Sequence, residues 1–273
     1  MKTKLFLSSV IIASAIFSFN SCKKKTEVDN ETQSVVDNAI CEQQFMTIQP
    51  IVNDKSISEK GLKRTNACES FNILSGDTTD ANNDKVYDNG PVTFQIDYGT
   101  GCAGSDGVFR SGKINITTAT RWSVYNNEAT IDLVNYKANN VTFSGQIKIT
   151  KPDSITITTQ IINGHCTDGS WNIDYAATKT MKQVAGANTK GDVSDDEYSF
   201  TGTSSGKNRE GRTFTTNIVN PLIKKMSCKY LTAGTLELTP DGFKTRSVDY
   251  GNGACDDDAT FTVNGQTVSF KLK

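Results

Sequence analysis

The chain has 273 residues, of which 29 are Lys or Arg, 30 are Asp or Glu and one is His. Removing Lys2 and Lys4 with a leader of 21 residues leaves 27 basic and 30 acidic residues, a net charge of −3. A nucleic-acid partner is therefore not expected, because phosphate binding needs a concentrated basic face. The single histidine also argues against a zinc site of the usual type.

The first 21 residues have the pattern of an export signal. Lys2 and Lys4 precede LFLSSVIIASAIFSF, an uncharged run of 15 residues that is too short to span a hydrocarbon core of roughly 30 Å. Ser21 and Cys22 follow, and this ending resembles the lipobox of bacterial lipoproteins, whose cysteine is acylated. We expect removal of residues 1–21 and anchoring of acylated Cys22 in a bilayer, because several acyl chains hold far more firmly than one. The alternative is an ordinary secretory signal followed by an incidental cysteine.

Residues 22–30 are interpreted as a polar tether, and residues 31–52 are the expected N-terminal helix. The apolar stripe of this helix consists of Val35, Ile40, Phe45 and Ile48. Pro50 is expected to end the helix, because its ring removes a backbone donor and clashes with the preceding turn. We expect the helix to pack against sheets or to cover an open sheet edge.

The remaining residues, 53–273, are predicted to form a β domain. Its segments alternate between apolar and polar residues and are rich in Ile, Val, Thr and Phe; examples are GKINITTATRW, NVTFSGQIKIT, SITITTQII, GRTFTTNIV, AGTLELTP and QTVSFKLK. Turn sequences such as YNNE, TPDGF and VNGQ connect them, and Asn-Gly in the last is a hairpin signal. About a dozen strands favour an all-β fold, either an antiparallel β-sandwich or an open barrel.

Setting Cys22 aside leaves an even number of cysteines, which in an oxidising compartment suggests disulfides. The six are Cys41, Cys68, Cys102, Cys166, Cys228 and Cys255. Two related sequences, VTFQIDYGTGC and TRSVDYGNGAC, each end at one of them, and another cysteine precedes each unit. This internal duplication, with units near 68–150 and 228–273, predicts the bonds Cys68–Cys102 and Cys228–Cys255. Cys41 and Cys166 are left as a third pair or as free thiols.

Several blocks together resemble a group of uncharacterised Bacteroidetes envelope lipoproteins. They are DNAICEQQFMTIQPIVND, DYGTGCAGSDGVFRSGKINIT, FTGTSSGKNREGRTFTTNIVNPLIKKMSCKY and GTLELTPDGFKTRSVDYGNGACDDDATFTVNGQTVSFKL. The resemblance covers most of the chain after the leader. It implies an all-β lipoprotein of the cell envelope and implies no active site. We expect the outer membrane as its location, facing either the periplasm or the cell surface.

A loop with the sequence DANNDKVYD is the candidate metal site. It places Asp80, Asn82, Asp84 and Asp88 in a spacing that resembles the short calcium loops of thrombospondin-type-3 segments, where alternate oxygen ligands wrap a hard cation. The loop is not an EF-hand, because Lys85 stands where that motif has glycine. Calcium is thus the one cofactor that the sequence suggests, and a polar loop serving solubility is the alternative.

Three further sets of residues are candidates for chemistry. His165 precedes Cys166, whose side chain should point to the other face of a strand, so we interpret His165 as structural rather than catalytic. Asp97 and Asp249 begin the repeated Asp-Tyr-Gly, and we expect each to accept backbone N–H groups of the following glycine turn. Aromatic residues could instead form a sugar platform, although burial in the core is favoured; these are Trp122, Trp171, Tyr125 and Tyr136.

Two functions follow from the sequence. The preferred one is a non-enzymatic envelope lipoprotein that binds a glycan or protein ligand or has a structural role. The alternative is an envelope hydrolase that acts on glycans with two carboxylates about 5 to 10 Å apart, one of them with a raised pKa.

Overall fold

The computed structural model describes residues 29–57, 68–104, 106–189 and 194–273. It contains helix α1 (Gln33–Ile57) and 14 strands. The strands are β1 (Ser70–Ser75), β2 (Val92–Asp97), β3 (Cys102–Ala103), β4 (Phe109–Thr118), β5 (Glu128–Ala138), β6 (Val141–Thr150), β7 (Thr156–Thr167), β8 (Asn172–Ala185), β9 (Glu197–Lys207), β10 (Thr213–Lys225), β11 (Leu231–Pro240), β12 (Arg246–Asn252), β13 (Asp258–Val263) and β14 (Gln266–Lys271).

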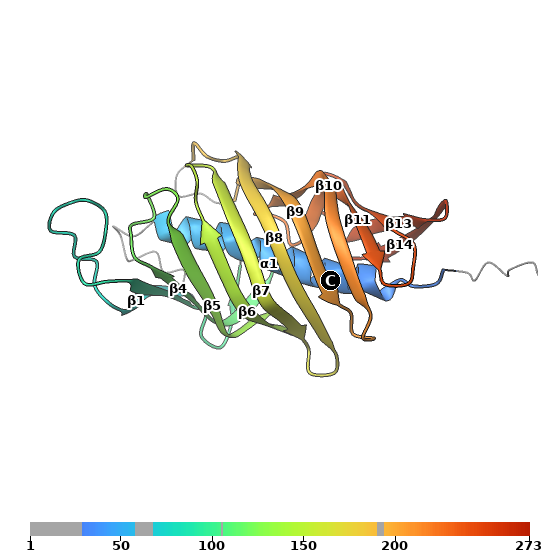
Figure 1. The fold of residues 1–273 in the computed structure, drawn as a ribbon, viewed down its shortest axis with the longest axis horizontal. Coiled ribbons are helices and arrows are strands. Elements are labelled where there is room, and N and C mark those ends of the chain that lie inside the picture. Colours follow the sequence, from blue (N-terminus) through green and yellow to red (C-terminus); the bar gives the residue numbers. More distant parts are fainter. Residues whose placement is uncertain (1–28, 58–67, 105, 190–193) are drawn as a thin grey trace, which may run out of the picture.

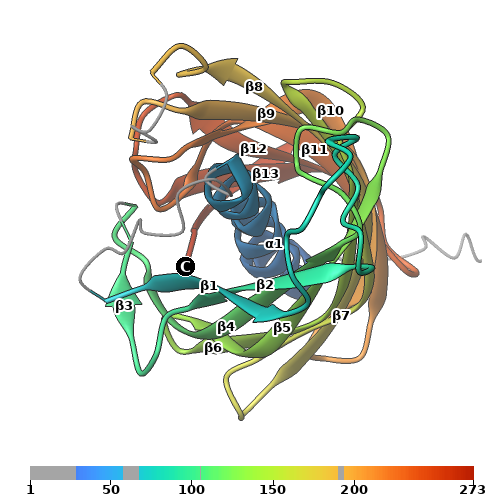
Figure 2. The ribbon, with the colours of Figure 1, turned by 90° about the vertical axis from the view of Figure 1, so that its left-hand side faces the viewer.

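All 14 strands belong to one antiparallel sheet whose order follows the chain, with β3 placed beside β4 off the main path. The sheet curves around α1 without closing into a barrel, as the view in Figure 2 shows. The expected all-β fold with one N-terminal helix is confirmed. Because the sheet is continuous, the open-barrel alternative describes it better than the two-sheet sandwich does.

Glycines at irregular points of the sheet help it to bend. Gly112 and Gly145 have φ values of 80° and 120° and coincide with register shifts between β4 and β5 and between β6 and β7. A Cβ atom on Gly112 would lie 2.2 Å from the backbone oxygen of Asn135. Such bulges increase local twist and curvature, which the sheet needs in order to surround a helix.

The predicted Asn-Gly hairpin is also confirmed. Asn264 and Gly265 have φ values of 54° and 75° and connect β13 to β14 through a two-residue turn. Positive φ at both positions is the geometry of the turn that matches the twist of two antiparallel strands.

Helix α1 lies along the longest axis of the molecule, with strands crossing it (Figure 1). Residues 37–53 are all buried, so the helix is an internal element and does not cover a sheet edge. The prediction that Pro50 ends the helix was wrong, because α1 continues to Ile57. Loss of one backbone hydrogen bond at a proline costs roughly 3 kcal/mol in a helix interior, and tertiary packing around a buried helix can offset that cost.

Candidate functional site

The six cysteines form three disulfides. Cys68–Cys102 and Cys228–Cys255 confirm the predicted pairs, with sequence separations of 34 and 27 residues. Cys41 and Cys166 form the third pair, so the alternative of free thiols was wrong for them. That bond fixes α1 to β7 across 125 residues of sequence.

The repeated Asp-Tyr-Gly residues have the structural role that the sequence predicts. Asp97 Oδ1 accepts a hydrogen bond of 2.7 Å from the Gly99 amide, and Asp249 Oδ1 accepts one of 2.9 Å from the Gly251 amide. Both glycines have positive φ, 56° and 100°. The two aspartates therefore fix their own turns, as short polar side chains commonly do.

Side-chain oxygens of the expected calcium loop form an ion pair and accept hydrogen bonds within the protein. Asp80 Oδ2 forms an ion pair of 3.1 Å with Arg121, and the Asp80 side chain is only 1% exposed. Asp88 Oδ2 accepts the Ala81 amide at 2.8 Å, and an Asp84 oxygen accepts the Asn82 side-chain amide at 3.1 Å. Among the described residues, no group of three or more His, Cys, Asp or Glu side chains is arranged to hold a metal ion. Calcium binding by this loop stays a prediction.

His165 lies on the exposed face of β7, on the side opposite the Cys166 disulfide. Its Nδ1 is 3.0 Å from Asp174 Oδ1, and its Nε2 is 3.1 Å from Asn172 Oδ1. Strand register also places Ser144 of β6 opposite His165. Both ring nitrogens have oxygen partners on β8, which supports the structural interpretation over a serine–histidine pair.

The four aromatic residues do not gather into one platform. Tyr136 is fully buried and Trp122 is 8% exposed, whereas Tyr125 is 48% exposed. The Trp171 ring is covered by the Arg209 guanidinium at 4.3 Å. Burial, the favoured alternative, is confirmed for Tyr136 and Trp122.

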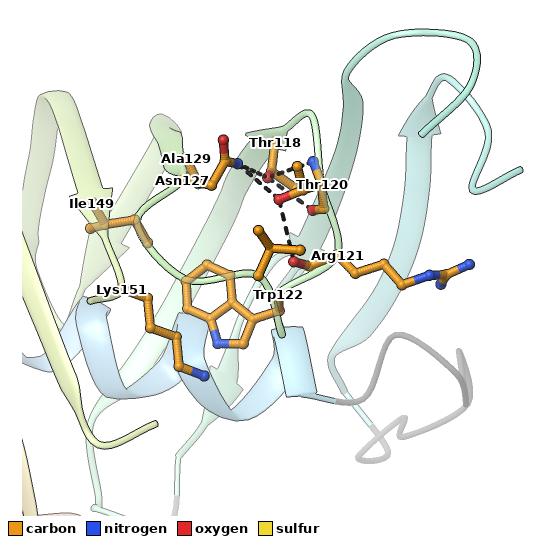
Figure 3. A pocket seen from close by; sticks show the side chains of 9 residues that line it. Thr118, Thr120, Arg121, Trp122, Asn127, Ala129, Ile149 and Lys151 are labelled. Carbon is orange, nitrogen blue, oxygen red and sulfur yellow. Dashed lines mark hydrogen bonds between the residues drawn. The ribbon is translucent and has the colours of Figure 1, made fainter. Parts of the chain in front are cut away.

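A small pocket adjoins Trp122 at the end of β4 (Figure 3). Its volume is about 10 Å³, which accommodates about one water molecule. Asn127 Nδ2 donates to the Thr120 hydroxyl at 2.9 Å, and Lys151 Nζ lies 5.5 Å from the Trp122 ring centre. The pocket is therefore too small for a sugar.

A larger feature lies on the outer face of β7–β10. Two adjoining hollows of about 550 and 540 Å³ open to solvent there and share Ala176, Ser205 and Thr215 in their linings. Outward-facing residues of the hollows are Gln160, Ile162, Asn163, Asp174, Thr178, Thr203, Lys207 and Thr213. This surface was not predicted from the sequence, although the alternating Ser and Thr in FTGTSSGK and TFTTNI indicate a polar face on these two strands. We call it the outer hollow.

A second missed feature is the polar interior. The ion pair between Glu42 of α1 and Lys179 of β8 measures 2.5 Å, and both side chains are at most 1% exposed. Tyr175 donates to the other Glu42 oxygen at 2.6 Å. Burial and the neighbouring Glu42 charge raise the pKa of Tyr175 well above its usual value, so its phenol stays protonated and acts as a donor.

Another buried cluster connects the first and last thirds of the sheet. Arg110 donates two hydrogen bonds to Asp106 at 2.9 and 2.6 Å, and Lys224 of β10 lies 3.9 Å from the same carboxylate. Burial alone would raise the pKa of Asp106, but hydrogen bonds from Arg110 and the charges of Arg110 and Lys224 hold it below its usual value. Burial, together with the Arg110 charge, lowers the pKa of Lys224 to about 8.

Cys22, the expected signal peptide and the tether up to residue 28 lie outside the described residues. Within the described part of the chain, α1 does not combine the length and apolar character that a membrane crossing requires. No protein-family model matches the sequence, and no curated protein or solved structure is significantly similar to it.

Proposed function

We propose that this protein is a lipid-anchored, non-enzymatic binding protein of the bacterial cell envelope, attached through acylated Cys22 to the outer membrane. The outer hollow is the observation that carries the binding role. It is a surface depression lined by small polar side chains, and the strands beneath it are hydrogen-bonded to neighbours on both sides. A rigid sheet holds such side chains in place, which lowers the entropic cost of binding.

The chemistry of the outer hollow favours a neutral, hydroxyl-rich ligand, and we propose a glycan. The shared centre offers the hydroxyls of Ser205 and Thr215, which donate and accept hydrogen bonds and carry no charge. Charged residues, Asp174 and Lys207, stand opposite one another in the strand register and balance each other. An extended peptide that adds to a sheet needs free backbone groups. Those of β8 and β9 are already paired with their neighbours, so this mode of peptide binding is disfavoured here.

Binding can be tested by titrating neutral oligosaccharides from the bacterial envelope into the protein by calorimetry. Ser205→Trp would place a large ring in both halves of the outer hollow, and we expect it to abolish the heat of binding. Thr262→Trp is the matched control, because Thr262 lies on β13, outside the hollow. Equal affinity of wild type and Ser205→Trp would contradict the proposed site. Release of shorter sugars during incubation would instead favour the hydrolase.

The anchor is tested separately by labelling cells with palmitate. We expect label on the wild-type protein and its loss, together with release from membranes, in Cys22→Ala. Retention of both label and membrane association in the variant would contradict the anchor without affecting the outer hollow. Proteolysis of intact cells would then show which side of the membrane the domain faces.

A further inference from the structure

The centre of the molecule holds an amine and a carboxylate that the proposed binding role does not use. Lys179 Nζ and Glu42 Oε1 are 2.5 Å apart, with side chains 1% and 0% exposed. They join the internal helix to the middle of the sheet. Cys41, the residue before Glu42, is already covalently bonded to β7, so the backbone around this contact is held in place.

The ammonium of Lys179 has too few partners for an ordinary buried ion pair. It carries three N–H donors, yet within the described part of the chain Nζ has no aligned hydrogen-bond partner and one ion-pair partner, Glu42 Oε1. A buried charge without full hydrogen bonding is costly, and its attraction to one counter-ion often fails to offset the loss of water. Burial at this position therefore contributes in favour of a reaction that replaces the two charges by a neutral group.

The two oxygens of Glu42 have different surroundings. Oε2 accepts hydrogen bonds from Tyr175 at 2.6 Å and from Ser204 at 3.3 Å, whereas Oε1 faces Lys179. The Thr216 hydroxyl lies 2.5 Å from that of Ser204 and can donate to it, and the Ser204 proton then has two acceptors within reach, Glu42 Oε2 at 3.3 Å and Asn38 Oδ1 at 3.4 Å. Two donors on one carboxylate oxygen stabilise the negative charge that develops when a nucleophile attacks the carbon, as in an oxyanion hole.

From this geometry we propose that Lys179 and Glu42 condense to form an intramolecular amide between α1 and β8. Nζ transfers a proton to Oε1 and attacks Cδ, Oε2 carries the developing charge, and the Cδ–Oε1 bond breaks. Oε1 leaves as water with two protons from the ammonium, and the third proton remains on the amide nitrogen. No oxidant or external reagent is needed.

Proximity makes this condensation possible without an enzyme. Well-oriented groups within a rigid structure can reach an effective concentration on the order of 10⁵ to 10⁸ M. The product replaces two buried charges by one neutral amide, whose oxygen retains its donors Tyr175 and Ser204. Tyr175 and Ser204 are therefore positioning residues for the bond.

Peptide mapping of the full chain by mass spectrometry tests the proposal. The protein must first be reduced and alkylated, because the Cys41–Cys166 disulfide would otherwise hold nearby peptides together. We expect one crosslinked peptide containing Glu42 and Lys179, lighter by one water than the two linear peptides combined, and near-complete loss of those linear peptides. Recovery of both linear peptides at full yield, or a crosslink at another pair of residues, would overturn the proposal.

Two variants complete the test. Lys179→Met removes the amine, so the crosslinked peptide should vanish and the linear Glu42 peptide should return. Lys224→Met removes a different buried lysine and should leave the crosslink in place. If Lys179→Met does not fold, the wild-type map still decides the question, because it requires no variant.

Discussion

The buried ammonium of Lys224 should make the stability of the protein depend on pH in an unusual direction. Its side chain is fully buried, and Asp106 at 3.9 Å is its counter-ion, while its Nζ also donates to the Lys229 carbonyl at 3.1 Å. Burial and Arg110 lower its pKa from 10.5 to about 8 in the folded state. The folded protein therefore loses this proton at a lower pH than the unfolded chain does.

The sign and the size of this pH dependence follow from the difference in proton binding between the folded and unfolded states. Below about pH 8 both states hold the proton, so the full penalty of the buried charge is present. Between pH 8 and 10.5 the unfolded chain binds more protons, so the free energy of unfolding rises with pH. The difference between 10.5 and 8 corresponds to roughly 3 kcal/mol, of which about 2 kcal/mol should be recovered between about pH 7 and about pH 9.5.

Urea denaturation of wild type and Lys224→Met at several pH values measures this effect. The comparison matters because buried tyrosines, Tyr98 among them, have raised pKa values and lower the stability of both proteins at alkaline pH. We expect the stability of wild type relative to the variant to increase by about 2 kcal/mol over the range from about pH 7 to about pH 9.5. Lys225→Met is the control, since that lysine is partly exposed and pairs with Glu197. A difference between wild type and Lys224→Met that does not change with pH would refute the reasoning.

Three other perturbations give distinct expectations. Replacing Cys41 and Cys166 by Ala opens a loop of 125 residues and should lower the free energy of unfolding in urea by roughly 4 to 5 kcal/mol; a loss below about 1 kcal/mol would contradict the chain-entropy estimate. Gly202→Ala would bring a Cβ atom to 2.2 Å from the Thr178 carbonyl, so melting temperature should fall well beyond the effect of a surface substitution. Arg246→Met leaves two buried carboxylates before α1 without their cation, and should cost about 3 to 5 kcal/mol by the same urea assay.

The sequence was most informative where local chemistry determines structure. Alternation of apolar residues identified the strands, and the two cysteine units identified Cys68–Cys102 and Cys228–Cys255 because each pair spans a single hairpin. Asp97 and the glycine that follows it fix their turn through contacts two residues apart. These features depend on neighbours in the chain, so a pattern can reveal them without knowledge of the fold.

The interior could not be predicted in the same way. The stretch CEQQ in the helix is polar, and polar helical positions ordinarily face solvent, so a stripe along one side was the natural expectation. The structure buries Glu42 and both glutamines that follow it. The sequence of β8 contains one indication of a buried charge, because Lys179 has the same alternation phase as the inward-facing Tyr175 and Met181. Its partner on α1 is 137 residues earlier, and only the fold brings the two together.

These interior charges also define where the helix lies inside the sheet. Along α1 and the residues just before it, three acidic positions meet three separate parts of the sheet: Glu31 meets Arg246 of β12, Asp37 meets Arg209 between β9 and β10, and Glu42 meets Lys179 of β8. An apolar helix in an apolar sheet could slide by a turn with little change in buried area. Here a shift of one turn, about 5.4 Å, would separate Glu31 from Arg246 and Asp37 from Arg209, and would move Glu42 away from Lys179 before the proposed amide could form. The polar core therefore selects one helix position, and the Cys41–Cys166 disulfide between α1 and β7 fixes the same position.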